Sequence, residues 1–86
     1  MSIYSISLKS SAAKELKKLP LELQQRTAKA IQKLTENPRL SGVVKLKGND
    51  NLYRYRVGEY RIIYDIDDSM QKVTITRIRH RSDVYR

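Results

Sequence analysis

The arginines are the residues of this sequence whose chemistry and spacing indicate a functional site. Arg54 and Arg56 are two residues apart in an alternating segment, and Arg61 follows a short turn. Because side chains alternate across a strand, Arg54 and Arg56 should point together, and Arg61 can meet them from a neighbouring strand. Guanidinium groups bind phosphate in a bidentate way and stack on bases. The cluster therefore predicts an anion-binding face.

Further residues near the end of the sequence can join this face. Arg77 or Arg79 can reach it if the last strand pairs beside the strand of Arg61, and the following segment brings His80, Arg81 and Tyr85 close to its rim. His80 is the one side chain whose unperturbed pKa lies near neutrality, so it can act as a base, although a single histidine is often structural. Tyr85 can pack, stack on a base or take part in proton transfer.

The arginines and the lysines near them also have interpretations other than anion binding. Arginines on the polar face of a half-buried sheet can serve solubility alone, and Glu59 and Asp65 can offset part of the charge. Several like charges on one face nevertheless repel one another, and an anionic ligand relieves that repulsion. Lysines at a strand edge can contact a phosphate backbone or protect the edge from aggregation. We count four further residues as RNA-binding candidates: Lys45, Lys47, Arg77 and Arg86.

The sequence supplies few groups for other chemistries. One histidine and no cysteine cannot make an ordinary transition-metal site, and neither a glycine-rich phosphate loop nor a nucleophilic serine motif is present. We therefore expect no metal and no cofactor. Catalysis on RNA would use the 2′-hydroxyl as nucleophile, with arginines stabilising the charge on the pentacovalent phosphorane.

Composition agrees with a polyanionic or acidic partner. The 86 residues carry 18 Lys and Arg against 9 Asp and Glu, a formal charge of +9. The charge is evenly spread, but residues 1–42 contain two arginines and residues 43–86 contain seven. The absence of cysteine suits a reducing cytosol, and no apolar run approaches the ~20 residues that span a bilayer. We expect one cytoplasmic domain over residues 1–86, with no membrane association.

Hydrophobic periodicity predicts the elements that position these residues. Alternation of period two predicts strands at residues 2–8, 52–57, 60–66 and 72–79, with residues 43–46 extended. Helical spacing predicts one helix capped by Ser10 or Ser11 and a second from Pro20 to Asn37. We predict an α+β fold of order β-α-α-β-β-β, a small antiparallel sheet with both helices packed on one face.

Four segments of the sequence resemble the RelE/ParE toxin superfamily: residues 45–48 (KLKG), 52–56 (LYRYR), 58–64 (GEYRIIY) and 78–85 (IRHRSDVY). The resemblance covers nearly the whole chain. It implies a RelE-like toxin paired with an antitoxin, and RelE members cut mRNA in the ribosomal A site without a metal. Ribosome, mRNA and antitoxin are thus the expected partners, the antitoxin through an acidic or amphipathic segment.

The resemblance also implies roles for individual residues. Arg54 and Arg56 match basic residues that hold or activate the RNA, although the RelE archetype has lysines there. Arg61 matches an arginine that stabilises the phosphate, and Arg79 one proposed to assist the leaving group. Because arginine hardly exchanges protons, Arg54 and Arg56 should act through charge.

The end of the sequence supplies the candidates for proton transfer. By the same resemblance, Tyr85 matches a tyrosine proposed to act on the 2′-hydroxyl or to orient the substrate, whereas His80 and Arg81 belong to a terminal form seen in many relatives. Which of Arg79, His80 and Arg81 protonates the leaving oxygen stays open. The hypothesis is a ribosome-dependent endoribonuclease; the alternatives are a ParE-like DNA gyrase inhibitor and a catalytically inactive basic binding module.

Overall fold

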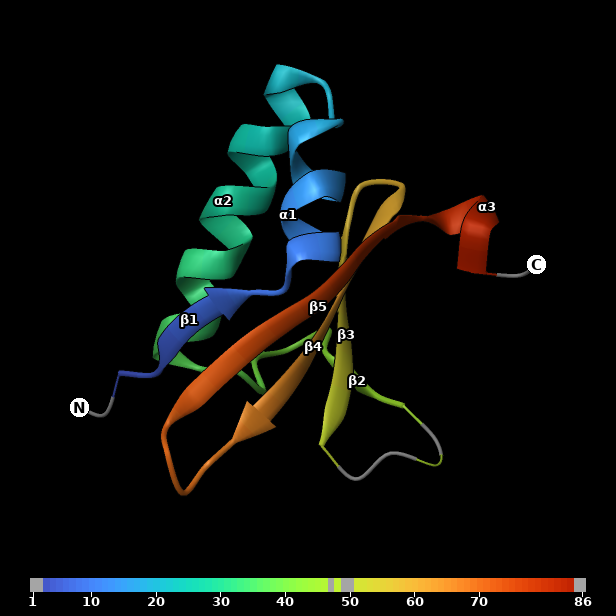
Figure 1. Cartoon of the computed structure of the whole chain (residues 1–86). Coiled ribbons are helices and arrows are strands. Elements are labelled where there is room, and N and C mark those ends of the chain that lie inside the picture. The colour runs from blue at the N-terminus through green and yellow to red at the C-terminus, as the bar shows by residue number, and fades with distance from the viewer. Residues whose placement is uncertain (1–2, 47, 49–50, 85–86) are drawn as a thin grey trace.

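The computed structural model describes residues 3–46, 48 and 51–84 (Figure 1). The predicted α+β fold is confirmed, with two helices on one face of a sheet. In chain order the elements are β1 (Ser5–Leu8), α1 (Ser10–Lys17), α2 (Leu21–Glu36), β2 (Val44–Lys45), β3 (Leu52–Val57), β4 (Tyr60–Asp67), β5 (Lys72–His80) and α3 (Arg81–Val84). Within these residues no helix is long and apolar enough to cross a membrane.

The sheet has the strand order β1-β5-β4-β3-β2. The strands from β2 to β5 pair antiparallel, as predicted, whereas β1 pairs parallel with β5. Parallel pairing requires a long crossover, and the α1–α2 hairpin with the following strands provides it. The extended segment expected at residues 43–46 forms the short edge strand β2, and one turn of helix, α3, follows β5.

The core lies between the helix pair and one face of the sheet. Ala12 of α1 and Ala30 and Leu34 of α2 pack against alternating residues of the strands. Period-two alternation holds in β3 and β4, so the polar residues between the core residues face away from the helices. The core residues of the strands are Tyr53, Val57, Ile62, Tyr64, Ile66, Val73, Ile75 and Ile78.

The predicted serine cap of the first helix is wrong. Lys9 occupies the N-cap position without a side-chain hydrogen bond, and Ser10 is already helical. The hydroxyl of Ser11 instead donates to the backbone oxygen of Thr76 at 3.0 Å. Within the described residues, no strand pairs with the edge of β5 beyond the end of β1, so the Thr76 carbonyl accepts this hydrogen bond and ties α1 to β5.

One end of the sheet is fixed by a polar and aromatic cluster, the anchored end: Tyr4, Arg39, Tyr53, Tyr64 and Asp68. Arg39 donates two hydrogen bonds to Asp68, at 3.0 and 2.8 Å, and its Nε donates to the hydroxyl of Tyr53. The hydroxyl of Tyr4 also donates to Asp68. Hydrogen bonds from Arg39 and Tyr4 lower the pKa of Asp68 to about 2. Tyr64 is fully buried, and its hydroxyl donates to the Pro38 carbonyl at 2.6 Å.

Candidate nucleic-acid interface

Three arginines stand in one row across the sheet on the face away from the helices. Arg56 of β3 pairs with Arg61 of β4, and Arg61 pairs with Arg79 of β5. Directly opposite residues share a face and lie close together, so we call Arg56, Arg61 and Arg79 the arginine row. Arg61, in the middle, is 8 % exposed, whereas the side chains of Arg79 and Arg56 are 33 % and 59 % exposed. Like charges placed opposite one another are destabilising, so the row favours an anionic ligand.

A β-bulge places Arg79 in this row. The register shifts between Ile63 and Tyr64, which pair with Arg77 and Ile75, so Thr76 is the extra residue in β5. Simple alternation from Ile75 would have turned Arg77 and Arg79 toward the helices. The inserted residue reverses the phase of the strand and re-aims both arginines to the other face.

A second row on the same face contains two more arginines. Arg54 pairs with Ile63, which pairs with Arg77. The predicted convergence of Arg54, Arg56 and Arg61 is thus confirmed in the register, and Arg77 joins them together with Arg79. Asp65, which we expected to offset part of the charge, lies on the same face but belongs to a further row, between Leu52 and Thr74.

Glu15 of α1 reaches this side of the sheet around the free edge of β5. Nε and Nη2 of Arg77 and the backbone N–H of Ile78 donate to its carboxylate, with the shortest distances 2.9 Å from Arg77 and 2.8 Å from Ile78. Arg79 Nε lies 3.8 Å from the same carboxylate. Burial alone would raise the pKa of Glu15, but these hydrogen bonds and the two cations hold it below its ordinary value. Glu15 therefore stays ionised and fixes the two arginines of β5.

Glu15 is a residue of this site that the sequence did not predict. The helix that contains Glu15, α1, packs against β5, and nothing in the local pattern of α1 predicts that contact. The one available signal is that Glu15 is the single acidic residue in a helix with basic residues at Lys14 and Lys17.

Glu59 provides a second, weaker carboxylate at the rim. It lies 3.9 Å from both Arg56 and Arg81, and its backbone oxygen accepts a hydrogen bond from the Arg81 N–H at 2.7 Å. All three side chains are more than half exposed, and exposed pairs at this distance contribute little to stability. The backbone contact places Arg81 next to the arginine row, at the rim position predicted for it.

His80 lies on the other face of the sheet. It pairs with Tyr60, and the two rings meet edge to face with centroids 5.1 Å apart. A cavity of about 260 Å³ on the helix side of the sheet is lined by His80, Tyr60, Leu19 and neighbouring residues. The N–H of Ser82 donates to His80 Nδ1, and the hydroxyl of Ser82 lies 2.8 Å from the same nitrogen. The structure therefore does not bring His80 together with the arginine row.

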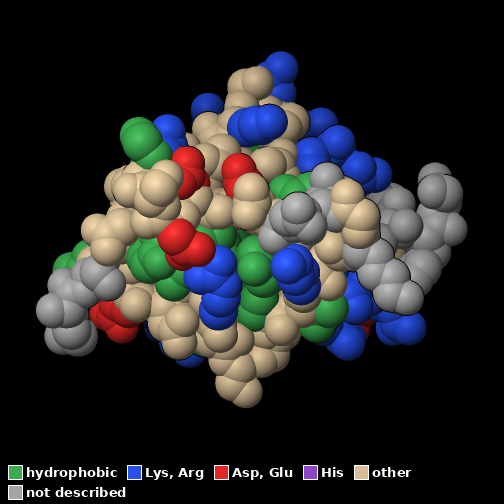
Figure 2. All heavy atoms as spheres, turned by 90° about the horizontal axis from the view of Figure 1, so that it is seen from below, with side chains coloured by type: hydrophobic (Ala, Val, Ile, Leu, Met, Phe, Trp, Pro, Cys, Tyr) green, Lys and Arg blue, Asp and Glu red, His purple; other side chains and the backbone are tan. Residues whose placement is uncertain are grey.

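The remaining candidates divide into those the structure describes and those outside it. Lys45 is exposed at the sheet edge and pairs with Tyr53, so its side chain is on the helix side and not on the arginine face. Lys47, Tyr85 and Arg86 lie outside the described residues. The view from below the molecule shows Lys and Arg side chains spread over the surface instead of gathered in a single patch (Figure 2).

The arginines of this face can bind and stabilise anions, but they are poorly suited to proton transfer. Guanidinium groups keep their proton at any physiological pH, so the arginine row can act only through charge and hydrogen bonds. Among the residues that the structure describes, no three His, Asp or Glu side chains are grouped as metal ligands. The arrangement thus fits electrostatic stabilisation of a phosphate by preorganised donors.

Comparisons with known proteins agree with this picture. A family model described as the ParE toxin of type II toxin-antitoxin system, parDE, matches residues 6–85. A putative RelE-like toxin protein of Escherichia coli is 31 % identical over 86 residues, covering 95 % of this chain and 90 % of the relative. Toxin RelE of Mycobacterium tuberculosis is 31 % identical over 84 residues, covering 96 % and 87 %.

Solved structures show the same fold. The archaeal RelE in the RelE-RelB complex from Pyrococcus horikoshii has a TM-score of 0.83 and 28 % identity, covering 94 % of this chain and 97 % of that one. The isolated E. coli RelE toxin has a TM-score of 0.81 and 27 % identity, with 95 % and 90 % covered. The likeness extends over almost the full length of each chain, so it includes both the helix pair and the sheet.

Proposed function

Because the chain belongs to the RelE/ParE superfamily and is a RelE toxin of a type II toxin–antitoxin system, we propose that it is a ribosome-dependent, metal-independent endoribonuclease that cuts mRNA in the ribosomal A site. The observation that carries the proposal is the arginine row, three guanidinium groups in register across β3, β4 and β5. The family resemblance implies that ParE-like gyrase inhibitors generally lack such a basic set, so the row supports the nuclease over that alternative.

In the proposed reaction the 2′-oxygen of one nucleotide attacks the adjacent phosphorus, and the bond to the 5′-oxygen of the next nucleotide breaks. The products of this step are a 2′,3′-cyclic phosphate and a 5′-hydroxyl, and addition of water to the cyclic phosphate would then give a 3′-phosphate. Arg61 stabilises the negative charge of the phosphorane from the centre of the row, Arg56 holds the RNA and Arg79 lies toward the leaving group. Glu15 positions Arg79 through its carboxylate.

Two proton transfers accompany these bond changes. The 2′-hydroxyl loses its proton to a base, and the leaving 5′-oxygen gains one. Since arginine cannot exchange protons readily, the proposal assigns the base to the end of the chain, where Tyr85 is the candidate, and not to His80 across the sheet. With so few proton donors, much of the rate comes from holding the RNA in line, and the ribosome supplies that constraint.

The proposed partner in the cell is a cognate antitoxin. Relatives of similar fold have been solved as RelE-RelB complexes from P. horikoshii and M. tuberculosis. We propose that an acidic or amphipathic segment of the antitoxin lies across the arginine face or displaces the segment after β5, which relieves the repulsion among the arginines.

The experiment that tests the activity compares cutting by purified toxin on free mRNA and on programmed ribosomes. A third sample contains programmed ribosomes that are first crosslinked, so that they stay assembled, and then treated with a chelator that removes divalent ions. We expect cutting within the A-site codon only on ribosomes, unaffected by the chelator, with a 5′-hydroxyl on the downstream fragment. Intact message combined with inhibition of gyrase supercoiling would overturn the proposal in favour of a ParE-like activity. Binding to ribosomes without cutting would mark an inactive binding module.

A further inference from the structure

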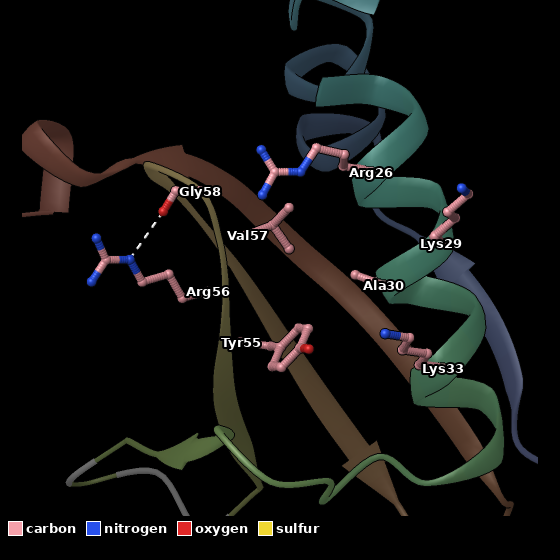
Figure 3. A pocket seen from close by; sticks show the side chains of 8 residues that line it. All are labelled: Arg26, Lys29, Ala30, Lys33, Tyr55, Arg56, Val57 and Gly58. Carbon is pink, nitrogen blue, oxygen red and sulfur yellow. Dashed lines mark hydrogen bonds between the residues drawn. The ribbon is translucent and has the colours of Figure 1, made fainter. Parts of the chain in front are cut away.

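A basic groove of about 260 Å³ lies between α2 and β3, on the helix side of the sheet (Figure 3). It is separate from the arginine face, because its floor is formed by Tyr55 and Val57, whose side chains point toward α2. The charged side chains that line it are all cations: Arg26, Lys29, Lys33 and Arg56.

The cations of α2 follow one stripe of the helix. Arg26, Lys29 and Lys33 are three and four residues apart, so they share a face over about 10 Å of helix length. All three are exposed, and none forms an ion pair with a carboxylate of the residues that the structure describes. Like charges at this spacing destabilise a helix, so an anion bound along the stripe would stabilise it.

Gly58 connects this groove to the arginine row. Arg56 Nε donates to the Gly58 oxygen at 2.9 Å, and a Cβ at Gly58 would stand 3.5 Å from Nη1 of Arg26. In the close-up view Arg56 points away from α2 on one side of Gly58, and the guanidinium of Arg26 lies on the other side, so the two cations flank the turn between β3 and β4 (Figure 3). Gly58 has φ +59°, a left-handed conformation that favours glycine at this turn. Arg56 belongs both to the arginine row and to the lining of the groove, so the two basic surfaces adjoin at this turn.

We propose that this groove binds the phosphate backbone of single-stranded RNA, as the continuation of the strand that crosses the arginine row; the assignment to the message strand rests on the proposed function. A cationic groove with an aromatic side chain is the pattern by which proteins hold single strands without reading sequence. Tyr55 supplies the ring, and among the described residues β2 pairs with β3 at Tyr53 and Arg54 and not at Tyr55. An acidic peptide could bind the same cations. The groove, however, has Arg56 at one end, and Arg56 also belongs to the arginine row, which is the proposed phosphate site. This shared residue favours RNA as the occupant.

The test measures binding without cutting. The probe is a fluorescent 2′-O-methyl RNA of ~12 nucleotides, which lacks the nucleophile and so reports binding even if the proposed nuclease activity is wrong. The groove variant is Arg26→Gln/Lys29→Gln/Lys33→Gln. The matched control, Lys9→Gln/Lys14→Gln/Lys17→Gln, removes the same formal charge from exposed positions on and beside α1. Dissociation constants are measured over a range of salt concentrations.

We expect the slope of log K against log salt to become shallower by about 2 in the groove variant, since each backbone contact in a single strand contributes about 0.7. The control should change the slope by less than half of that. Equal changes in the two variants would overturn the proposal. If the triple variant has a lowered melting temperature, the single variant Lys29→Gln replaces it, and its slope of log K against log salt must be shallower by about 0.7.

Two further arms separate the competing occupants. A polyglutamate peptide should compete weakly and bind both variants alike; a loss confined to peptide binding in the groove variant would assign the groove to an acidic protein and overturn the RNA proposal. On ribosomes, the groove variant should bind less well only when message is present. Equal losses on empty and programmed ribosomes would assign the groove to ribosomal RNA and contradict the message-strand assignment.

Discussion

Arginine occupies both ends of the same sheet, in opposite circumstances. At the anchored end, Arg39 donates two hydrogen bonds to Asp68 and one to Tyr53. In the arginine row, the nearest carboxylates of the described residues lie 3.9 Å from Arg56 and 3.8 Å from Arg79, and each of these arginines faces Arg61 across a strand pair. The charge of Arg39 is satisfied within the protein, whereas the row concentrates charge that a ligand can satisfy.

The difference shows that an arginine's role follows from its partners and not from its type. A hydrogen-bonded, bidentate pair fixes loops from distant parts of the chain, because Arg39 follows α2 and Asp68 lies in the turn between β4 and β5. Charges that repel one another across neighbouring strands reduce stability and are retained where they serve binding. The comparison makes distinct predictions for the two ends.

Of the two outer arginines of the row, Arg79 should give the larger loss of activity when it is replaced by alanine. Loss of one preorganised donor to a developing negative charge lowers a rate by about 10²- to 10³-fold. The measurement is the single-turnover rate of message cutting on programmed ribosomes. Lys72→Ala, at the opposite end of β5, is the matched control and should retain the rate. Equal loss in both variants would mean that the position along β5 does not matter.

A smaller and more diagnostic effect is expected from Glu15→Gln. Without the carboxylate, Arg77 and Arg79 lose their fixed orientation, so kcat should fall by about 10-fold. KM should fall as well, because a negative charge near the phosphate site is gone. Glu22→Gln removes an exposed acidic residue of α2 and should change neither constant. An unchanged kcat in Glu15→Gln would show that the carboxylate serves only stability.

The anchored end should respond in stability and not in activity. Tyr64→Phe removes the hydroxyl that donates to Pro38 and leaves a buried carbonyl without that donor. The expected loss in the free energy of unfolding is about 1–2 kcal/mol, measured by urea denaturation. The rate of cutting by the folded protein should match the wild type. A large loss of activity without a loss of stability would contradict the prediction that the anchored end contributes to stability and not to cutting.

The smallest effect is a pH dependence at Asp68. Hydrogen bonds from Arg39 and Tyr4 lower the pKa of this carboxylate to about 2 in the folded state. Its stabilising contribution is therefore present above the unfolded pKa, near 4, and is lost as the pH falls toward 2. The melting temperature of Asp68→Asn should lie a few degrees below the wild type at pH 6, and the gap should close by pH 2. A gap that is constant with pH would contradict the assignment.

Much of the arginine face can be predicted from alternation. Because Tyr53 and Val57 are apolar at period two, Arg54 and Arg56 between them had to point the other way, and the short turn before Tyr60 fixed Arg61 opposite. These residues share short-range geometry: they lie within one hairpin, where the register follows from the turn.

The positions of Thr76, His80 and Glu15 depend on contacts between distant parts of the chain, so alternation does not predict them. The bulge at Thr76 reverses the phase of β5, and its one sequence signal is the spacing of three between Ile75 and Ile78, where a regular strand would have two. The same shift turns His80 to the helix side. Glu15 could not be predicted, because its contact depends on how α1 packs against an open strand edge 62 residues away.

The central claim is that the arginine row, and not arginine in general, cuts RNA. The most direct test maps the 5′ ends of message on programmed ribosomes for two matched variants, Arg61→Ala in the row and Arg39→Ala at the anchored end, both checked for folding by circular dichroism. The account predicts that cutting at the A-site codon disappears in Arg61→Ala and persists in folded Arg39→Ala. Persistent cutting in Arg61→Ala, or equal loss in both variants, would contradict it.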